Sequence, residues 1–227
     1  MYLYNVHTHD IASAIEGGYD VRCILNTYPE DFEQKKQMYP NTWFSCGIHP
    51  WLSDKSEESF ARLKEIAEDS DVVAIGEIGL DKLQGPDITT QIAVFRKQIK
   101  LATDVRKPII IHCVKAWDEM IALYKEYKTD VPWIIHGYRG NPEQTKQLCK
   151  LGFKFSLGEF FNKESVKLIP LDSIFCETDT SELTICKVYE NISTEIGMNL
   201  NHFAILAAEN IKNTFQGVTY FYPRNND

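Results

Sequence analysis

The pattern that decides the fold lies in residues 72–112, VVAIGEIGLDKLQGPDITTQIAVFRKQIKLATDVRKPIIIH. Apolar runs at its two ends predict a strand at Val72–Gly76 and another at Ile109–Ile111. Between them, apolar residues recur at the spacing of one helix face: Ile92, Phe95, Ile99 and Ala102. A strand, a helix and a second strand form the unit from which parallel α/β sheets are built. The segment therefore predicts an α/β protein.

The same unit recurs along the whole chain. Short apolar runs predict further strands at Leu3–Val6, Val21–Leu25, Trp43–Gly47, Trp133–Ile135, Phe153–Leu157 and Ser173–Cys176. Apolar residues at helical spacing predict one helix through Phe60, Leu63 and Ala67 and a closing helix through Phe203, Ala207, Ile211 and Phe215, with Gly217 beyond it. A third helix is predicted to begin with Asn141 as its cap before Pro142 and to end at Gly152. Eight alternating units favour a closed barrel over an open sheet. We predict a single-domain (β/α)8 TIM barrel over residues 1–227.

Composition and charge exclude several classes of protein. With 44% hydrophobic and 25% charged residues, the chain has the composition of an ordinary globular protein. Acidic residues outnumber basic ones by 32 to 24, a net charge of −8, which argues against broad adhesion to nucleic acid or anionic membranes. The N-terminus lacks the pattern of a secretion signal, and six scattered cysteines without a CxxC pair favour reduced thiols. We expect a cytoplasmic protein with no membrane partner.

Ligand-type side chains follow or end the predicted strands. They are His7, His9, Glu77, His112, His136 and Asp179. Taken singly, each fits a hydrogen-bonded core residue, a loop cap or a member of an ion pair. Together they lie at the carboxyl ends of the strands, where the active sites of such barrels are found. Neutral imidazole and carboxylate are ligands of divalent metals, so the set predicts a site for two ions.

Several longer motifs carry a resemblance to a known family. They are NVHTHD (5–10), CGIHPW (46–51), AIGEIGLD (74–81), KPIIIHC (107–113), IIHGYRG (134–140), FCETD (175–179) and AAENIKNTF (207–215). In these the chain resembles the TatD family of metal-dependent deoxyribonucleases, within the amidohydrolase-like barrels. The GEIGLD motif, followed about thirty residues later by an apolar strand ending in histidine, is the specific part of this signal. The HxH motif alone is a weak signal of this family.

The resemblance implies a role for each ligand-type residue. His7, His9 and Asp179 resemble the ligands of one ion, His112 and His136 those of a second, and Glu77 the bridge between the two. The implied cofactors are two divalent metal ions, either Zn²⁺, Mg²⁺ or Mn²⁺. His49 resembles a substrate or phosphate contact beside the metals; a cap of the turn after the third strand is the alternative.

The chain also departs from the family pattern at several positions. Asn5 stands where members commonly have aspartate, and Trp51 stands where they have a second histidine. The usual HCFSG is HGYRG at residues 136–140, Cys113 and Val114 replace a serine and an arginine, and residues 180–183 lack the usual Ala-Pro. These differences leave the metal site credible and put DNA in doubt as the natural substrate.

The predicted reaction is hydrolysis by metal-activated water. Asp179 and Glu77 are the predicted catalytic residues, with Asp179 as general base or proton shuttle. Arg139 and Lys115 follow metal-bearing strands and are predicted to steady charge on phosphate oxygens, although Lys115 also fits an exposed loop side chain. The expected substrate is a phosphodiester, with DNA as one candidate.

Two alternatives remain open from the sequence. The first is an amidohydrolase acting on an amide, lactone or other small substrate. Many such enzymes bridge their metals with a carboxylated lysine, and Glu77 in that position favours the phosphodiesterase. The second alternative is a non-catalytic metal-binding scaffold, which would not need all six ligands.

Overall fold

The computed structural model describes residues 1–11 and 13–215, so Gly217 lies outside the described residues. Eight parallel strands pair in the order β1-β3-β4-β5-β6-β7-β8-β9, which confirms the predicted (β/α)8 fold. Their bounds are β1 Tyr2–Thr8, β3 Tyr19–Thr27, β4 Trp43–Cys46, β5 Val72–Asp81, β6 Ile109–Val114, β7 Trp133–Ile135, β8 Lys154–Leu157 and β9 Ile174–Cys176. Every predicted strand is present with its ends within three residues of those predicted, except β5, which continues five residues beyond Gly76.

One short strand, β2 (Ile15–Glu16), was not predicted; it pairs antiparallel with β3. Glu16 lies opposite Tyr19, so Gly17 and Gly18 form the two-residue turn between them. Both glycines have positive φ, 56° and 84°, as this kind of tight hairpin turn requires. The Gly-Gly pair is the signal that could have predicted it.

The ring of strands closes between β9 and β1. Thr8 and Asp179 form a parallel bridge, and the amide of Asp179 donates to the carbonyl of His7 at 3.0 Å. The closure is therefore made just beyond the end of β9, by the loop that carries Asp179. This backbone contact brings the first and last strand ends together.

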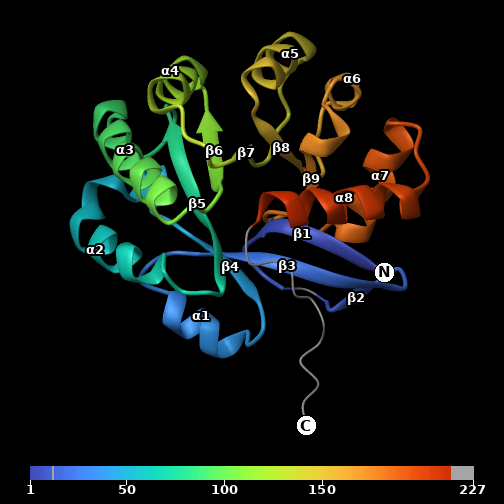
Figure 1. Ribbon diagram of the computed structural model, residues 1–227, viewed down its shortest axis with the longest axis horizontal. Coiled ribbons are helices and arrows are strands. Elements are labelled where there is room, and N and C mark those ends of the chain that lie inside the picture. Colours follow the sequence, from blue (N-terminus) through green and yellow to red (C-terminus); the bar gives the residue numbers. More distant parts are fainter. Residues whose placement is uncertain (12, 216–227) are drawn as a thin grey trace.

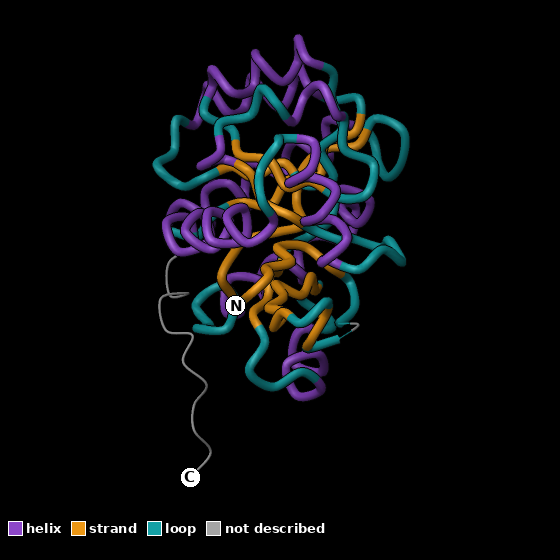
Figure 2. Tube along the Cα trace, turned by 90° about the vertical axis from the view of Figure 1, so that its right-hand side faces the viewer, coloured by secondary structure: helices purple, strands orange, loops and turns teal. Residues whose placement is uncertain are grey.

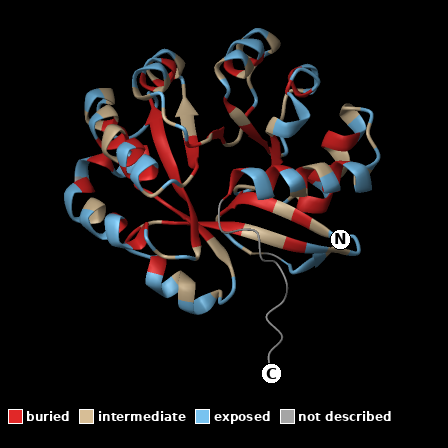
Figure 3. Ribbon diagram, in the orientation of Figure 1, coloured by how far each residue is buried: buried red, intermediate tan, exposed pale blue. Residues whose placement is uncertain are grey.

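Helices lie outside the strands (Figures 1 and 2). Their bounds are α1 Phe32–Met38, η1 Pro50–Lys55, α2 Ser56–Ile66, α3 Ile88–Asp104, α4 Trp117–Tyr127, α5 Pro142–Leu151, α6 Lys163–Val166, η2 Leu171–Ser173, α7 Ile185–Glu195 and α8 Leu200–Thr214. The predicted caps of α5 are confirmed, because the Asn141 side chain accepts from the Gln144 amide and Gly152 ends the helix at φ 90°. Helix surfaces turned away from the strands are exposed, whereas the strands are mostly buried (Figure 3).

The interior of the barrel is apolar at one end. A buried cluster joins residues from strands around the ring with Ile211 of α8 and with Phe215 directly after this helix: Val6, Ile24, Val73, Ala74, Ile110, Ile134, Phe175, Ile211 and Phe215. Ile110 and Ile134 lie two residues before His112 and His136, so on an extended strand each pair shares one face. The predicted ligands therefore form the next layer, toward the carboxyl ends of the strands.

Two further features concern the cysteines and the hydrophobicity of the helices. All six cysteines are free in the structure. Among the described residues, no helix is both long enough and apolar enough to cross a membrane.

Candidate metal centre

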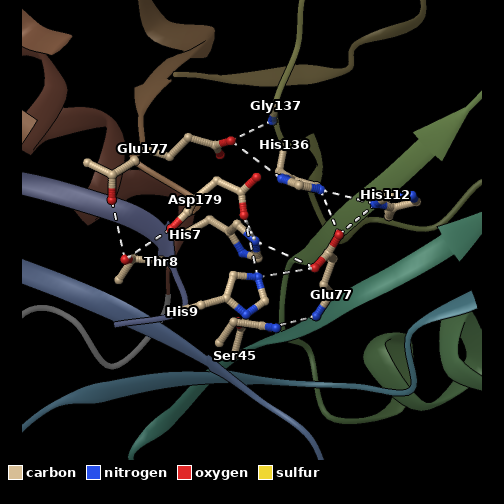
Figure 4. Close-up of polar contacts among 12 residues, drawn as sticks. His7, Thr8, His9, Ser45, Glu77, His112, His136, Gly137, Glu177 and Asp179 are labelled. Atoms are coloured by element: carbon tan, nitrogen blue, oxygen red, sulfur yellow. Dashed lines mark hydrogen bonds and ion pairs between the residues drawn. The ribbon is translucent and has the colours of Figure 1, made fainter. Parts of the chain in front are cut away.

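The structure brings all six predicted ligands together at the carboxyl ends of the strands (Figure 4). His7 lies in β1 and His9 directly after it, Glu77 and His112 lie in β5 and β6, and His136 and Asp179 follow β7 and β9. The distances among their side chains, given below, are those of a single polar cluster. Sequence reasoning therefore located the site, while the metal-binding role of each residue stays a prediction.

The local structure of β5 turns Glu77 into this cluster. The strand does not end at Gly76, as the sequence suggested, but continues to Asp81 with an irregular register against β6. An extra residue between paired positions re-aims the side chains of a strand, a device common beside active sites. The amide of Glu77 donates to Asn26 Oδ1 at 2.9 Å, which fixes the backbone at this point.

Gly79 makes the close approach of β5 to β6 possible. Its φ is 145°, and a Cβ at this position would lie 2.0 Å from the carbonyl oxygen of His112. Any side chain here would push the two strands apart. Gly79, the second glycine of the GEIGLD motif, thus keeps Glu77 and His112 within reach of each other.

The two carboxylate oxygens of Glu77 face different groups of histidines. Oε2 lies 3.6 Å from His7 Nε2 and 3.8 Å from His9 Nε2. Oε1 lies 2.7 Å from both His112 Nδ1 and His136 Nε2. One buried carboxylate therefore connects two sets of nitrogen donors.

Asp179 completes the group around His7 and His9. Its Oδ1 lies 3.5 Å from His7 Nε2 and 3.4 Å from His9 Nε2. The residue has a positive φ of 53°, held by backbone hydrogen bonds with His7 on β1 and with His9 directly after it. Its side chain is 37% exposed, against 5% for Glu77, so Asp179 is the carboxylate that solvent or substrate reaches first.

The donor set fits a divalent metal. His7 is fully buried, and neither of its ring nitrogens has a hydrogen-bond partner among the described residues. A buried polar group without a partner is costly, and a metal ion on one of these nitrogens would remove that cost. Ligand atoms about 2.1 Å from one ion in a tetrahedral arrangement lie roughly 3.4 Å apart. The spacings around His7, His9 and Asp179 are close to this value.

The charges of the cluster are strongly coupled. Burial opposes the ionisation of Glu77 and of Asp179, but the facing imidazoles outweigh it and hold both pKa values below their ordinary range. Burial likewise opposes protonation of His136, yet Glu77 and Glu177 hold its pKa well above the usual value. The metal-free cluster therefore keeps its carboxylates charged and carries a proton on His136 at neutral pH.

We expect metal uptake to release protons at neutral pH. Because a metal binds the deprotonated imidazole, His136 must lose its proton, and the affinity should rise as the pH increases toward its raised pKa. Calorimetric titration with Zn²⁺ in buffers of different ionisation enthalpy measures the number of protons released. Glu177→Gln, which removes one of the charges that raise this pKa, should lower that number. A binding heat that does not depend on the buffer would contradict the expectation.

His49 caps the turn after β4, as one of its two predicted roles required, and also faces the cluster. Its Nδ1 accepts from the amide of Trp51 at 3.3 Å, which caps η1, and its Nε2 lies 3.3 Å from Glu77 Oε1. Burial lowers the pKa of His49 despite the neighbouring Glu77, so the ring is neutral near pH 7. With Nδ1 occupied as an acceptor, the proton is on Nε2, and His49 acts as a hydrogen-bond donor toward the cluster.

Two carboxylates behind the histidines were not predicted. Asp81 Oδ2 lies 3.2 Å from His112 Nε2, and Glu177 Oε1 lies 3.4 Å from His136 Nδ1. Glu177 Oε1 also accepts from the Gly137 amide at 2.6 Å. Such partners orient metal-binding histidines and fix which nitrogen is free to bind. Their signal in the sequence is the position of both acids within the motifs, in AIGEIGLD and FCETD.

Asn5, one of the positions that depart from the family pattern, has a structural role. Asn5 is buried and bonds Thr178 twice, through Nδ2 to Oγ1 at 2.7 Å and through Oδ1 from the amide at 3.1 Å. It therefore anchors the segment that carries Asp179.

Arg139 is exposed and borders a cavity of about 250 Å³ together with Glu177 and Asp179. Lys115 is exposed directly after β6, and no contact places it at the cluster within the described part of the chain.

The sequence matches the family model described as TatD related DNase over residues 6–216. A relative from Bacillus subtilis, named as the uncharacterized metal-dependent hydrolase YabD, is 34% identical over 203 residues, covering 78% of this chain and 79% of the relative. A protein of Erwinia billingiae, named as the 3'-5' ssDNA/RNA exonuclease TatD, is 30% identical over 154 residues, covering 62% of this chain and 58% of that protein.

Solved structures share the fold. The TatD homologue YJJV from Escherichia coli superimposes with a TM-score of 0.83 at 22% identity, covering 94% of this chain and 97% of the other. A TatD family hydrolase from Entamoeba histolytica gives a TM-score of 0.74 at 19% identity, covering 95% and 98%. With the family model matched over nearly the whole sequence, the chain belongs to the TatD family of metal-dependent hydrolases.

Proposed function

We propose that the chain is a two-metal phosphodiesterase that cleaves its substrate with a metal-activated water. The observation that carries this proposal is the arrangement of Glu77, whose two oxygens face separate groups of histidines. A carboxylate in this position can bridge two ions. His7, His9 and Asp179 would hold one ion, and His112 and His136 the other.

Divalent ions in such a site supply an activated water and polarise the bond that is cleaved. The chain's own residues then handle the proton and the charge of the substrate. Asp179 is ionised and partly exposed, so its carboxylate can accept the proton from the water. His49 presents a buried N–H toward the cluster and can donate to a substrate oxygen. Arg139, at the rim of the adjacent cavity, can steady a phosphate oxygen.

A nucleic acid strand is the substrate class we favour. The Erwinia relative is named as an exonuclease of single-stranded DNA and RNA, and the family model as a DNase. The net charge of −8 argues that such a strand is held at the metal site rather than by a broad basic surface. The Bacillus relative, similar over more of the chain, is named only as a hydrolase.

A screen of metal-loaded protein tests the proposal. We expect up to two Zn²⁺ or Mn²⁺ per chain by elemental analysis, and cleavage of single-stranded DNA, RNA or a model phosphodiester. Because ions that bind only the native state stabilise it, EDTA should lower the melting temperature of the loaded protein. Absence of bound metal would contradict the proposed centre. Hydrolysis of amides or lactones without any phosphoester would identify an amidohydrolase instead.

Arg139→Ala is expected to slow phosphodiester cleavage by about a hundredfold, the usual cost of losing one donor to transition-state charge. Any amide or lactone hydrolysis should be nearly unchanged, because no phosphate charge develops there. Arg62→Ala, which removes an exposed arginine from α2, is the matched control and should have no effect. Equal losses on both substrate types in Arg139→Ala would point to a general metal or folding defect.

A further inference from the structure

Trp51 occupies a fixed place beside the metal centre although its side chain is 44% exposed. It lies in η1, where its amide donates to His49 Nδ1 at 3.3 Å. From the other side the loop after β5 packs against its backbone, since a Cβ at Gly85 would lie 2.8 Å from the Cα of Trp51. These two contacts fix the backbone of Trp51, and its indole ring lies with its centroid 6.1 Å from that of His112.

The indole N–H of Trp51 reaches the acid behind His112. Nε1 donates to Asp81 Oδ2 at 2.8 Å, and the same oxygen lies 3.2 Å from His112 Nε2. The other oxygen of Asp81 accepts from the amides of Leu83 and Gln84, at 2.7 and 3.2 Å. Asp81 is therefore held by donors on both oxygens. Only Trp51 and His112 share Oδ2 among the described residues.

The contact between Asp81 and His112 Nε2 determines how the imidazole ring of His112 is oriented toward the cluster. When His112 Nδ1 binds a metal, its remaining proton is on Nε2 and must be donated, and Asp81 is the acceptor that the structure provides. Without the indole N–H, the carboxylate of Asp81 would lose one of the two donors on Oδ2 and could rotate or take up water. The ring of His112 would then lose part of its orientation toward Glu77.

We propose that Trp51 is a positioning residue for the ion held by His112, acting through the shared oxygen of Asp81. This inference rests on the proposed two-metal centre. It adds that one of the two ions depends on a tryptophan at a position where the chain departs from the family pattern. His7, His9 and Asp179 make no direct contact with Trp51 or Asp81 among the described residues and meet this chain of hydrogen bonds only through Glu77, so the affinity of the ion they would hold should depend little on Trp51.

Trp51→Phe keeps the aromatic ring and removes only the N–H. Loss of such a supporting partner typically weakens metal binding by about 10- to 100-fold. In calorimetric titration of the metal-free protein with Zn²⁺, we expect one of the two binding steps to weaken by this factor and the other to stay unchanged. Because the side chain is half exposed, the variant should fold, which circular dichroism and the melting temperature of the metal-free protein check.

A double-mutant cycle tests whether Trp51 acts through Asp81. Asp81→Ala should weaken the same step, and adding Trp51→Phe to it should cause no further loss, because the shared oxygen is already gone. Trp133→Phe is the matched control: it removes an indole hydrogen bond to Thr129 in the core, and it should lower the melting temperature without weakening either step.

Each result decides between distinct explanations. Additive losses in the cycle, or equal weakening of both steps in Trp51→Phe, would mean that the tryptophan has only a structural role and would overturn the inference. Unchanged binding in Trp51→Phe would overturn it as well, while leaving the two-metal centre in place. If the wild-type protein took up no ion, the proposed function itself would fail.

Discussion

Glu77→Ala is expected to remove at least one metal ion per chain and to abolish hydrolysis. The side chain faces both groups of histidines, so its loss deprives each group of a carboxylate ligand. A metal ion contributes several kcal/mol of transition-state stabilisation. Since each 1.4 kcal/mol is a factor of ten, the rate should fall on the order of a thousandfold or more. Elemental analysis and initial rates on a phosphodiester measure the two effects.

Glu77→Gln separates charge from packing. Glutamine keeps the volume of a side chain that is only 5% exposed, but its amide cannot bridge two ions as a carboxylate does. We expect the same loss of metal as in Glu77→Ala. Glu65→Ala, at an exposed position of α2, removes an acid away from the site and should change neither quantity. Full metal content with substantial activity in Glu77→Gln would contradict a bridging role.

The sequence predicted the strands because each is a short apolar run bounded by polar residues, and burial in a parallel barrel requires such runs. The predicted end of β5 at Gly76 was wrong. A charged residue within an apolar run normally marks the end of a buried strand. In this barrel the strand continues to Asp81 because the inward-facing acid is satisfied by histidines from other strands.

The cluster of six ligand-type residues was predictable because its members are of the right chemical type and each lies at a strand end, while their binding of metal stays a prediction. The supporting acids were not, because the partner of a given histidine is set by packing over a long stretch of chain. Asp81 lies 31 residues from His112, and the Trp51 indole reaches Asp81 across 30 residues. The motifs AIGEIGLD and FCETD contain both acids, but no local pattern encodes which histidine each acid meets; these pairs become visible only when neighbouring strands and loops are placed side by side.

His49 shows a different limit of sequence reasoning. A turn cap and a substrate or phosphate contact were weighed as alternatives; the structure shows the cap on Nδ1 and turns Nε2 toward Glu77, so the substrate contact stays a prediction. An imidazole has two polar atoms that point in opposite directions, so the two readings never excluded each other. The same holds for His112, which lies between Glu77 and Asp81.

Asp179→Asn is expected to keep most of the metal while slowing hydrolysis. The amide oxygen can still face His7 and His9, and asparagine tolerates the left-handed backbone at φ 53° better than most residues. What it loses is the ability to accept a proton, a contribution that typically amounts to about 10²–10⁴ in rate.

Asp179→Ala provides the contrast, because alanine removes the ligand oxygen and is strained at positive φ. We therefore expect Asp179→Ala to lose metal as well as activity, whereas Asp179→Asn loses activity with metal retained. Elemental analysis and kcat on one phosphodiester substrate give both readouts for the two variants. If Asp179→Asn lost as much metal as Glu77→Ala, the carboxylate would be needed as a charged ligand rather than for the proton. If it kept its full rate, proton transfer would belong to another group, and the exposed position of Asp179 at the mouth of the cluster would serve only to hold the ion.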